Sequence, residues 1–508
     1  MSRVRLRYSG IINYVTITLS LFTGFAFSVM VTRRLKVEEY GLWSVINSLT
    51  AILCYPHLLY GYWVTRFIAR GVKDAVKTGL YLSAIFIISL TPIYILTSMS
   101  YIFLFGSHTT IYFLLGLLYF YCVYFWYYWR SVTRGLAPEL WGYGLFLGEI
   151  MKVSVGYLLL VILRIGLLGV IFTLILSFTV MNLTVFIGVK KLNVLSSHCK
   201  VNGSLMKRWL RNLWIPLIDL LSNVLLSSEQ LVISAISGTT VPSAFLQVSR
   251  VTTLPISYGS ALASGLYAKL LAKVRVEDLK EVLRMIFSMN NFTLVTELLL
   301  AIPILSLLNP KYTVGASAVL ILAVATYFEV LIKVFNITLM GIETVDVKEE
   351  VNFKEIMHSY LVKSSLIVML RNFFAIILAA FLLIIKVLGD DPVNQVVAVT
   401  LSWLISSLPT LAVLTLMTKR KLSNFIPWSE LGISILASMP IVFYYLLLKV
   451  HEIRVQIFYR DFAILLCHIT IAGLLYVTIM FFLSKWFRSL CLNILLYVRR
   501  TLQETFGK

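Results

Sequence analysis

The stretch VTRRLKVEEYG, residues 31–41, places three basic and two acidic residues between two long apolar runs. Similar apolar runs of about 20 residues recur along the 508-residue chain, and each is long enough to cross a bilayer as a helix. The composition is 59% hydrophobic and 13% charged, whereas soluble domains are about half apolar and a quarter charged. We therefore predict an all-α polytopic membrane protein in which this stretch is the turn between the first two spans.

The apolar runs predict about fourteen transmembrane helices. Most of the 44 Lys and Arg residues fall at the termini and in every second loop, which predicts cytoplasmic termini and an outer position for residues 31–41. The net charge of +21 then comes from basic residues that flank the spans on the cytoplasmic side, so we expect no nucleic-acid partner. The predicted spans are residues 9–31, 42–68, 80–105, 110–129, 140–163, 167–189, 213–236, 243–271, 286–308, 314–340, 364–387, 393–418, 431–448 and 462–483.

A weak internal repeat appears when the sequence is shifted by about 202 residues, which places residues 35–45 on the start of the eighth predicted span. Six spans precede the seventh, and six more end with the twelfth. Two parallel six-helix lobes around a central cavity, plus two C-terminal helices, are therefore predicted. The predicted domains are residues 1–200, residues 201–422, and residues 423–508, the last including an amphipathic cytoplasmic tail.

Several classes of protein are disfavoured by what the sequence lacks. The five cysteines include no CxxC pair, and no GxxxxGK motif occurs, so we expect no disulfide framework, metal, cofactor or P-loop ATPase activity. A glycan polymerase or ligase would need a large outer loop, and the predicted outer loops are short. A non-catalytic scaffold would have little use for charges inside spans, because each is costly there. We therefore expect a protein that is not an enzyme.

Four predicted helices carry polar stripes when projected at about 100° per residue. Such stripes arise either from helix packing through small and hydroxylated residues or from a shared wet cavity. They occur on the first two helices of each predicted repeat, which favours the cavity. The stripes are Asn13, Thr16, Ser20 and Thr23; Ser44, Ser48, Tyr55, Tyr62 and Arg66; Asp219, Asn223, Ser227, Gln230 and Ser234; and Gln247, Arg250, Ser257 and Ser264.

Charged residues inside predicted spans form two groups. Glu149 with Lys152 and Glu329 with Lys333 are three and four positions apart, and both are interpreted as self-neutralising structural pairs. The second group is predicted to have no partner in reach on the same helix, and its members are Arg250, Arg371, Asp219, Glu229 and Glu297. Arg250 either pairs with Asp219 or Glu229 on the neighbouring span or presents its guanidinium to a phosphate.

The stretch YFYCVYFWYYWR, residues 119–130, is rich in aromatic side chains. It lies at the predicted cytoplasmic end of the fourth span, where an aromatic belt is expected. Stacking on sugar rings is the alternative interpretation. The belt is the favoured one.

Two passages resemble a known family. TRRLKVEEYGLWSVINSL, residues 32–49, resembles the R-x-LG-x-x-EYG-x-[YFW]-S passage of the polysaccharide flippases, although Lys36 stands where that family has Gly. RSVTRGLAPELWGYGLFLGEI, residues 130–150, resembles their connection between helices 4 and 5. These proteins move lipid-linked oligosaccharides and belong to the multidrug/oligosaccharidyl-lipid/polysaccharide exporter superfamily. The resemblance implies fourteen helices, a lateral gap between helices 1 and 8, and a multi-pass protein of the plasma membrane.

The resulting hypothesis is a flippase that works by alternating access on a polyprenyl or dolichyl phosphate-linked glycan, with membrane lipids and glycosyltransferases or polymerases as partners. The coupling ion, H⁺ or Na⁺, is left open. The alternative is an ion-coupled multidrug antiporter of the same superfamily, which would have an acidic cavity. The expected substrate ligands are Arg250 first, then Arg66 and Arg371, with Gln247, Asn223 and Asn13 for the sugars; Asp219 or Glu229 is expected to bind the coupling ion.

The outer turn has its own expected roles. Glu38 and Glu39 stand where carboxylates cap the start of the second helix. Arg33 and Arg34 can pair with these carboxylates. Direct substrate contact is the less favoured alternative, and closure of an outer gate is left open.

Overall fold

The chain is helical through most of the residues that the computed structural model describes, which are 6–192, 200–211, 213–263, 266–343, 357 and 359–493. In this part of the chain eleven helices are long and apolar enough to cross a membrane, or twelve if α2 and α3 form one bent span. The prediction of an all-α polytopic membrane protein is confirmed. The other two predicted spans are α1, a single helix of 29 residues, and residues 243–271, which form several shorter helices.

The helices follow one another with short connections. Their bounds are α1 Leu6–Arg34, α2 Val37–Cys54, α3 His57–Ala69, α4 Asp74–Phe105, α5 Thr110–Leu136, α6 Pro138–Gly156, α7 Leu167–Lys191, α8 Gly203–Arg211, α9 Trp214–Ser237, α10 Val241–Thr252, α11 Leu254–Ser257, α12 Leu266–Ala272, α13 Val276–Leu308, α14 Ala316–Ile342, α16 Tyr360–Ile385, α17 Pro392–Lys421, α18 Trp428–Leu447 and α19 Phe458–Leu483. Short helical turns join several of them: η1 Ser107–Thr109, η2 Tyr157–Ile162, η3 Tyr258–Ala263, η4 Pro310–Gly315 and η6 Val450–Glu452.

The chain divides into two compact units. Unit 1 is Met1–Gln247 with Asn372–Val399, and unit 2 is Val248–Arg371 with Thr400–Lys508. The unit boundaries fall inside α10, α16 and α17. The predicted division into lobes at residues 200 and 422 describes a repeat rather than packing, and it stays a prediction.

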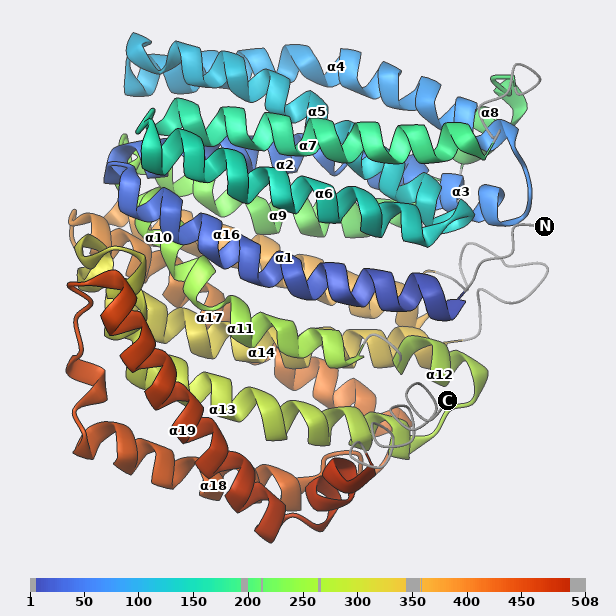
Figure 1. The fold of residues 1–508 in the computed structure, drawn as a ribbon. Helices are drawn as coiled ribbons and strands as arrows, with labels where there is room; N and C mark the ends of the chain where they lie inside the picture. Colours follow the sequence, from blue (N-terminus) through green and yellow to red (C-terminus); the bar gives the residue numbers. More distant parts are fainter. Residues whose placement is uncertain are drawn as a thin grey trace, which may run out of the picture. The chain divides into compact units, whose positions relative to one another are not determined.

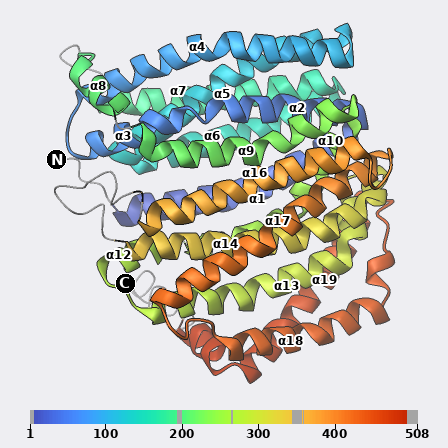
Figure 2. The same cartoon turned by 180° about the vertical axis from the view of Figure 1, so that it is seen from behind.

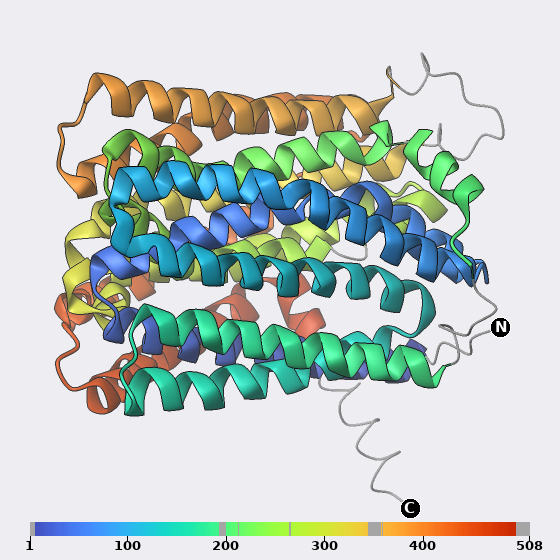
Figure 3. The same ribbon diagram turned by 90° about the horizontal axis from the view of Figure 1, so that it is seen from above.

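Unit 1 is built on the antiparallel neighbours α6 and α7, which run side by side (Figures 1 and 3). Their backbones approach closely at Gly148, where an added Cβ would lie 2.3 Å from the Met181 side chain. The Ser177 hydroxyl donates a hydrogen bond of 2.8 Å to the Gly148 carbonyl across this contact. Small and hydroxylated residues therefore hold these helices together, as is usual where lipid supplies no hydrophobic driving force.

The turn that opens α2 packs against the turn between α9 and α10 within unit 1. The Thr240 hydroxyl donates a hydrogen bond of 2.9 Å to the Glu38 carbonyl. A Cβ on Gly41 would lie only 1.8 Å from the Thr240 carbonyl oxygen, so only glycine fits there. Glu38 and Thr240 are 202 positions apart, which is the shift of the sequence repeat.

Unit 2 is centred on α13. The helices α18 and α19 form a hairpin that packs on α13, and α14 packs antiparallel to it (Figures 1 and 2). The Tyr327 hydroxyl of α14 donates to the Asn291 side-chain oxygen at 2.5 Å, and the Asn291 amide donates to the Ser434 hydroxyl at 2.7 Å. One buried polar chain thus joins α14, α13 and α18, and two clusters of apolar side chains pack around it.

Candidate functional site: a basic cavity and a buried arginine cluster

A bend in the second predicted span shapes one side of a cavity in unit 1. The helices α2 and α3 meet at 51° around Tyr55 and Pro56. Proline has no backbone N–H, so the helical hydrogen-bond pattern is interrupted there. The Nδ1 atom of His57 lies 2.7 Å from the Cys54 carbonyl oxygen. Because a carbonyl only accepts, Nδ1 carries the proton, and the bend is stabilised by this side chain.

The cavity has a volume of about 550 Å³. Its walls come from the end of α2, from α3, from the C-terminal half of α5 and from the start of α9. Three guanidinium groups and one carboxylate line it, so positive charge is in excess. The lining residues are Tyr55, His57, Leu58, Gly61, Tyr62, Thr65, Arg66, Tyr127, Arg130, Ser131, Arg134, Pro216, Asp219 and Asn223.

Aromatic rings orient the charged and polar groups of this cavity. The Arg66 guanidinium lies 4.5 Å from the centre of the Tyr62 ring. The His57 ring stacks on Tyr127 with 4.6 Å between ring centres. Such contacts restrict the rotamers of long side chains, while their hydrogen-bonding edges stay available. The site is therefore partly preorganised for an anionic, hydroxyl-rich ligand.

Two further contacts fix the cavity walls. The Asn223 amide donates a hydrogen bond of 2.6 Å to the Asp219 backbone carbonyl, which leaves the Asn223 side-chain oxygen as an acceptor. An added Cβ on Gly135 would lie 2.6 Å from the Thr65 carbonyl oxygen. Glycine at this position thus lets α5 approach α3 closely. As a result, arginines of both helices line the same cavity.

Three of the predicted site residues, Arg66, Asn223 and Asp219, are brought together in this cavity. Arg130 and Arg134 were not predicted, because they follow the fourth predicted span, 110–129, and were assigned to the loop after it. A signal for them did exist. Tyr127, Arg130 and Arg134 are spaced by three and four residues and so lie on one face of a helix.

The aromatic stretch 119–130 does not form a lipid-facing belt. Phe120, Tyr124 and Tyr128 are fully buried inside unit 1, and the Tyr128 hydroxyl donates to the Val76 carbonyl at 2.7 Å. Tyr127 lines the cavity instead. The belt interpretation is wrong for these rings, since they belong to the protein core and the cavity wall.

Unit 2 holds a second group of basic residues. The guanidinium groups of Arg250 and Arg371 lie 5.5 Å and 5.4 Å from the centre of the same Trp403 ring. Glu329 of α14 interacts electrostatically with both arginines. Its carboxylate also lies 2.8 Å from the Lys333 amine, so the predicted pair on α14 is present. Three cations therefore interact with the one carboxylate of Glu329. Of these cations, Arg371 is only 5% exposed.

The predicted residues on α9 and α10 have structural contacts within unit 1. The Gln247 side-chain oxygen accepts hydrogen bonds from Gln230 at 3.4 Å and from Ser44 at 3.5 Å. Polar stripes on three predicted helices therefore meet at this point. Glu229 is buried in α9, and it belongs to unit 1, whereas Arg250 belongs to unit 2.

The outer-turn residues are placed at the junction of α1 and α2. Arg33 and Arg34 end α1. The Glu39 carboxylate accepts a hydrogen bond of 3.0 Å from the Lys36 backbone N–H at the start of α2. The side chain of Asn13 lies outside the described residues.

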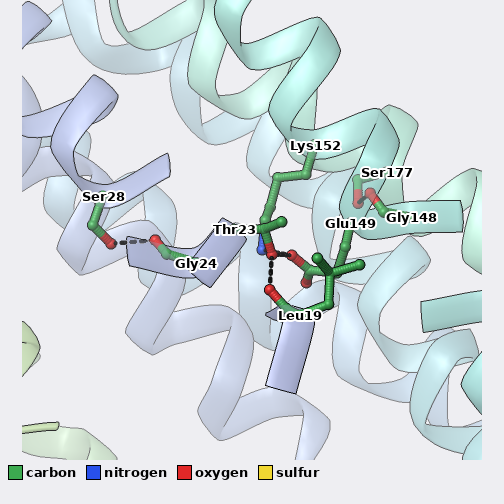
Figure 4. Close-up of polar contacts among 8 residues, drawn as sticks. All are labelled: Leu19, Thr23, Gly24, Ser28, Gly148, Glu149, Lys152 and Ser177. Atoms are coloured by element: carbon green, nitrogen blue, oxygen red, sulfur yellow. Dashed lines mark hydrogen bonds and ion pairs between the residues drawn. The ribbon is translucent and has the colours of Figure 1, made fainter. Parts of the chain in front are cut away.

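The predicted Glu149–Lys152 pair is present on α6 (Figure 4). The Lys152 amine lies 2.6 Å from the Glu149 carboxylate, which is buried. The Thr23 hydroxyl of α1 donates to the same carboxylate. This pair neutralises itself and joins α1 to α6, so it is a structural element of unit 1 rather than part of the cavity.

Comparison with known proteins gives a result for the fold. No family model matches the sequence, and no curated protein matches it. An inward-facing MATE multidrug resistance transporter of the MOP superfamily superposes with a TM-score of 0.58 at 15% identity, over 80% of this chain and 96% of that one. The chain therefore shares its fold with this transporter. The lipid II flippase MurJ superposes with a TM-score of 0.59 at 15% identity, over 95% of this chain and 99% of that one.

A MOP superfamily transporter from Pyrococcus furiosus gives a TM-score of 0.51 at 15% identity, over 82% of this chain and 94% of that one. Identities of this size establish the shared fold and no more. Both multidrug transporters and a lipid flippase share it, so the substrate must be argued from the site.

Proposed function

We propose that this protein is a flippase that moves a lipid-linked oligosaccharide from the cytoplasmic to the outer leaflet. The observation that carries the proposal is the cavity of unit 1, where Arg66, Arg130 and Arg134 face only one carboxylate, Asp219. A phosphate-linked sugar cannot enter hydrocarbon unaided, because its charges and hydroxyls would lose their water. A cavity with fixed cations and hydrogen-bonding groups replaces that water.

Each part of the ligand has a matching group in the cavity. Guanidinium groups bind phosphate oxygens through paired, charge-assisted hydrogen bonds. The Tyr62 ring presents an apolar face with a polar edge, which suits a sugar ring. The Asn223 amide and the His57 ring supply donors and acceptors for hydroxyl groups. The lipid tail would remain in the bilayer.

Transport would follow the alternating-access scheme of transporters built from repeats. With cytoplasmic termini, the basic cavity opens toward the cytoplasm, where lipid-linked glycans are assembled, so a glycosyltransferase would supply the substrate. Arg250 and Arg371 would meet the phosphate at a later stage of the cycle. Movement against a concentration gradient would draw on H⁺ or Na⁺.

A multidrug antiporter is the competing function, and the MATE neighbours favour it. A transporter of cationic drugs is best served by an acidic cavity, because like charges repel. The excess of arginine in unit 1 argues for an anionic substrate instead. One experiment distinguishes the flippase from the multidrug antiporter.

The test is reconstitution of the full chain into liposomes that contain a fluorescent polyprenyl-pyrophosphate oligosaccharide, with movement between leaflets read from the label that an impermeant quencher can reach. We expect transport by the wild type and its loss in the triple variant Arg66→Ala, Arg130→Ala, Arg134→Ala. Arg70→Ala is the matched control, because Arg70 is an exposed arginine at the end of α3 that does not line the cavity. Efflux of cationic dyes without glycan transport would overturn the proposal in favour of the antiporter.

A further inference from the structure

The segment that leads from α7 into α9 is a basic feature that the proposed glycan site does not use. Residues 190–212 contain six Lys and Arg residues and no Asp or Glu. Within them lies α8, Gly203–Arg211. Successive residues of a helix are turned by about 100°, so α8 has an apolar half and a basic half. The apolar half carries Leu205, Met206, Trp209 and Leu210, and the basic half carries Lys207, Arg208 and Arg211.

The segment is fixed to the start of α4 before α8 begins. The Lys200 backbone N–H donates a hydrogen bond of 3.1 Å to the Asp74 carboxylate, and the Asn202 N–H donates one of 3.0 Å to the Thr78 hydroxyl. The Asn202 side-chain oxygen accepts hydrogen bonds from the backbone N–H groups two and three residues further on. These are the groups that an N-cap side chain satisfies. The helix α8 therefore starts at a defined place beside α4 (Figure 1).

Trp209 connects α8 to α3 as well. Its side chain is fully buried, and its ring lies edge-on to the Phe67 ring with 5.8 Å between ring centres. The Arg208 guanidinium lies 5.5 Å from the centre of the same Phe67 ring. Phe67 is the residue after Arg66, which lines the cavity of unit 1. A contact that holds α8 in place therefore also holds α3 next to a cavity arginine.

The other side chains of α8 and of the residues before it form an exposed surface of mixed character. Lys207, Arg208 and Arg211 are exposed. Leu210 and Val201 are exposed too, at 43% and 48%. A helix that exposes basic and large apolar side chains together suits the boundary between lipid headgroups and acyl chains. The apolar groups enter the bilayer there, and the long basic side chains reach the headgroups.

Charge and position together favour anionic lipid over an acidic protein as the partner of this surface. The helix α8 lies at the end of unit 1 where α3 ends and the spanning helix α4 begins (Figures 1 and 2). The ends of spanning helices lie at the bilayer surface. The predicted orientation makes this the cytoplasmic leaflet, whose anionic lipids attract basic segments. An acidic protein would match the charges and leave the exposed Leu210 unexplained, whereas anionic phospholipids match both.

We propose that α8 is an interfacial helix whose basic residues Lys207, Arg208 and Arg211 bind the headgroups of anionic phospholipids, and that this binding fixes the end of α3 through Trp209 and Phe67. Lipid binding stands on the contacts and charges of unit 1 alone. Its effect on transport rests on the proposed function, because α3 carries a cavity arginine. The transporter then reaches its full rate only in a membrane that carries negative charge.

The first test needs no substrate. Phosphatidylglycerol should raise the thermal midpoint of the purified full-length protein in neutral detergent more than phosphatidylcholine with the same acyl chains does, and salt should shrink the difference. The difference should be largely lost in the triple variant Lys207→Gln, Arg208→Gln, Arg211→Gln, and partly lost in Lys207→Gln alone, which disturbs the fold least. It should persist in the matched control Lys419→Gln, Arg420→Gln, Lys421→Gln, which removes three exposed charges at the end of α17.

Several results would overturn lipid binding by α8. An equal response to the two lipids would remove the preference for negative charge. An equal loss in both triple variants would reduce the effect to overall charge. A loss in Arg66→Ala would place the lipid in the cavity. A response to poly-glutamate and none to phosphatidylglycerol would assign the surface to an acidic protein.

The second test uses the liposome assay with increasing phosphatidylglycerol. The initial rate of glycan movement by the wild type should rise, and in the α8 triple variant the ratio of rates with and without phosphatidylglycerol should fall to unity. Trp209→Ala keeps the contacts of the segment with α4, so its lipid-dependent midpoint shift should remain while its transport rate no longer responds. A rate that still rises in Trp209→Ala would overturn the coupling through α3. A wild type that moves no lipid-linked glycan would overturn the proposed function, and the midpoint shift would still decide lipid binding.

Discussion

The arginines of unit 1 and unit 2 differ in what surrounds them. Arg66, Arg130 and Arg134 are exposed and share a cavity of about 550 Å³ with a single carboxylate. Arg371 is 5% exposed, and it shares both Trp403 and Glu329 with Arg250. The arginine side chains of unit 1 are therefore exposed to solvent, whereas Arg371 in unit 2 is surrounded by protein groups.

The difference in exposure between the two groups of arginines suits them to different roles, ligand binding in unit 1 and structural stabilisation in unit 2. An exposed guanidinium can exchange water for a phosphate at little cost to the fold. A buried one depends on its counter-ion, because removing that partner leaves an uncompensated charge. This contrast favours the cavity of unit 1 as the place where substrate first binds, with Arg66 ahead of Arg250. Four changes test it.

The largest effect is expected from an acid-to-amide change made in each region. Glu329→Gln leaves Arg250, Arg371 and Lys333 without their carboxylate, so we expect a loss of about 3–5 kcal/mol in the free energy of unfolding. Asp219→Asn, in the exposed cavity, should change it by less than about 0.5 kcal/mol. Thermal unfolding of both purified variants measures the difference. Equal losses would mean that the two regions do not differ in kind.

A smaller effect is expected when a lysine is removed from each intramembrane pair. Lys152→Met leaves the buried Glu149 without its ion-pair partner, at a cost of about 2.5–3.5 kcal/mol. Lys333→Met should cost less, because Arg250 and Arg371 still interact with Glu329, and because the Lys333 side chain is 47% exposed against 13% for Lys152. The two unfolding curves, recorded in the same detergent, give the comparison. The reverse order would contradict the view that Glu329 belongs to a larger cluster.

The walls of the cavity should be sensitive to added volume. Gly135→Ala places a Cβ 2.6 Å from the Thr65 carbonyl oxygen, so α3 and α5 must separate, at a cost of about 1–3 kcal/mol. Transport should fall with it, because Arg66 and Arg134 move apart. Gly432→Ala is the control: nothing lies within 4 Å of its added Cβ, and alanine favours the helix. Normal transport in Gly135→Ala would show that the wall spacing is unimportant.

Parts of this contrast could be predicted from the sequence. Glu149 with Lys152 and Glu329 with Lys333 were predicted as pairs, because contacts three and four residues apart need only helical geometry. The polar stripes likewise placed Arg66, Asp219 and Asn223 on faces that avoid lipid. Local periodicity was sufficient for these features, and for most of the spanning helices.

The rest depended on contacts between distant helices. Arg130 and Arg134 join the cavity only because α3 bends at Pro56 and because Gly135 admits α5 to close contact. Nothing in the local pattern predicted that residues 243–271, expected as one span, would break after Thr252. Long-range contacts of this kind cannot be derived from spacing along one sequence.

The smallest effect on stability, and the sharpest on binding, is expected for Arg66→Ala. Arg66 is exposed and contacts Tyr62 at 4.5 Å, so its loss should change the free energy of unfolding by less than about 0.5 kcal/mol. Inorganic pyrophosphate at 100 times its dissociation constant should stabilise the wild type by about 2.7 kcal/mol. Losing one charge-assisted contact of about 1.5–3 kcal/mol weakens binding roughly tenfold or more, so the midpoint shift should shrink in Arg66→Ala and persist in Arg70→Ala. If the shift is instead lost only in Arg250→Ala, the phosphate site lies in unit 2, and the distinction between the two arginine groups is reversed.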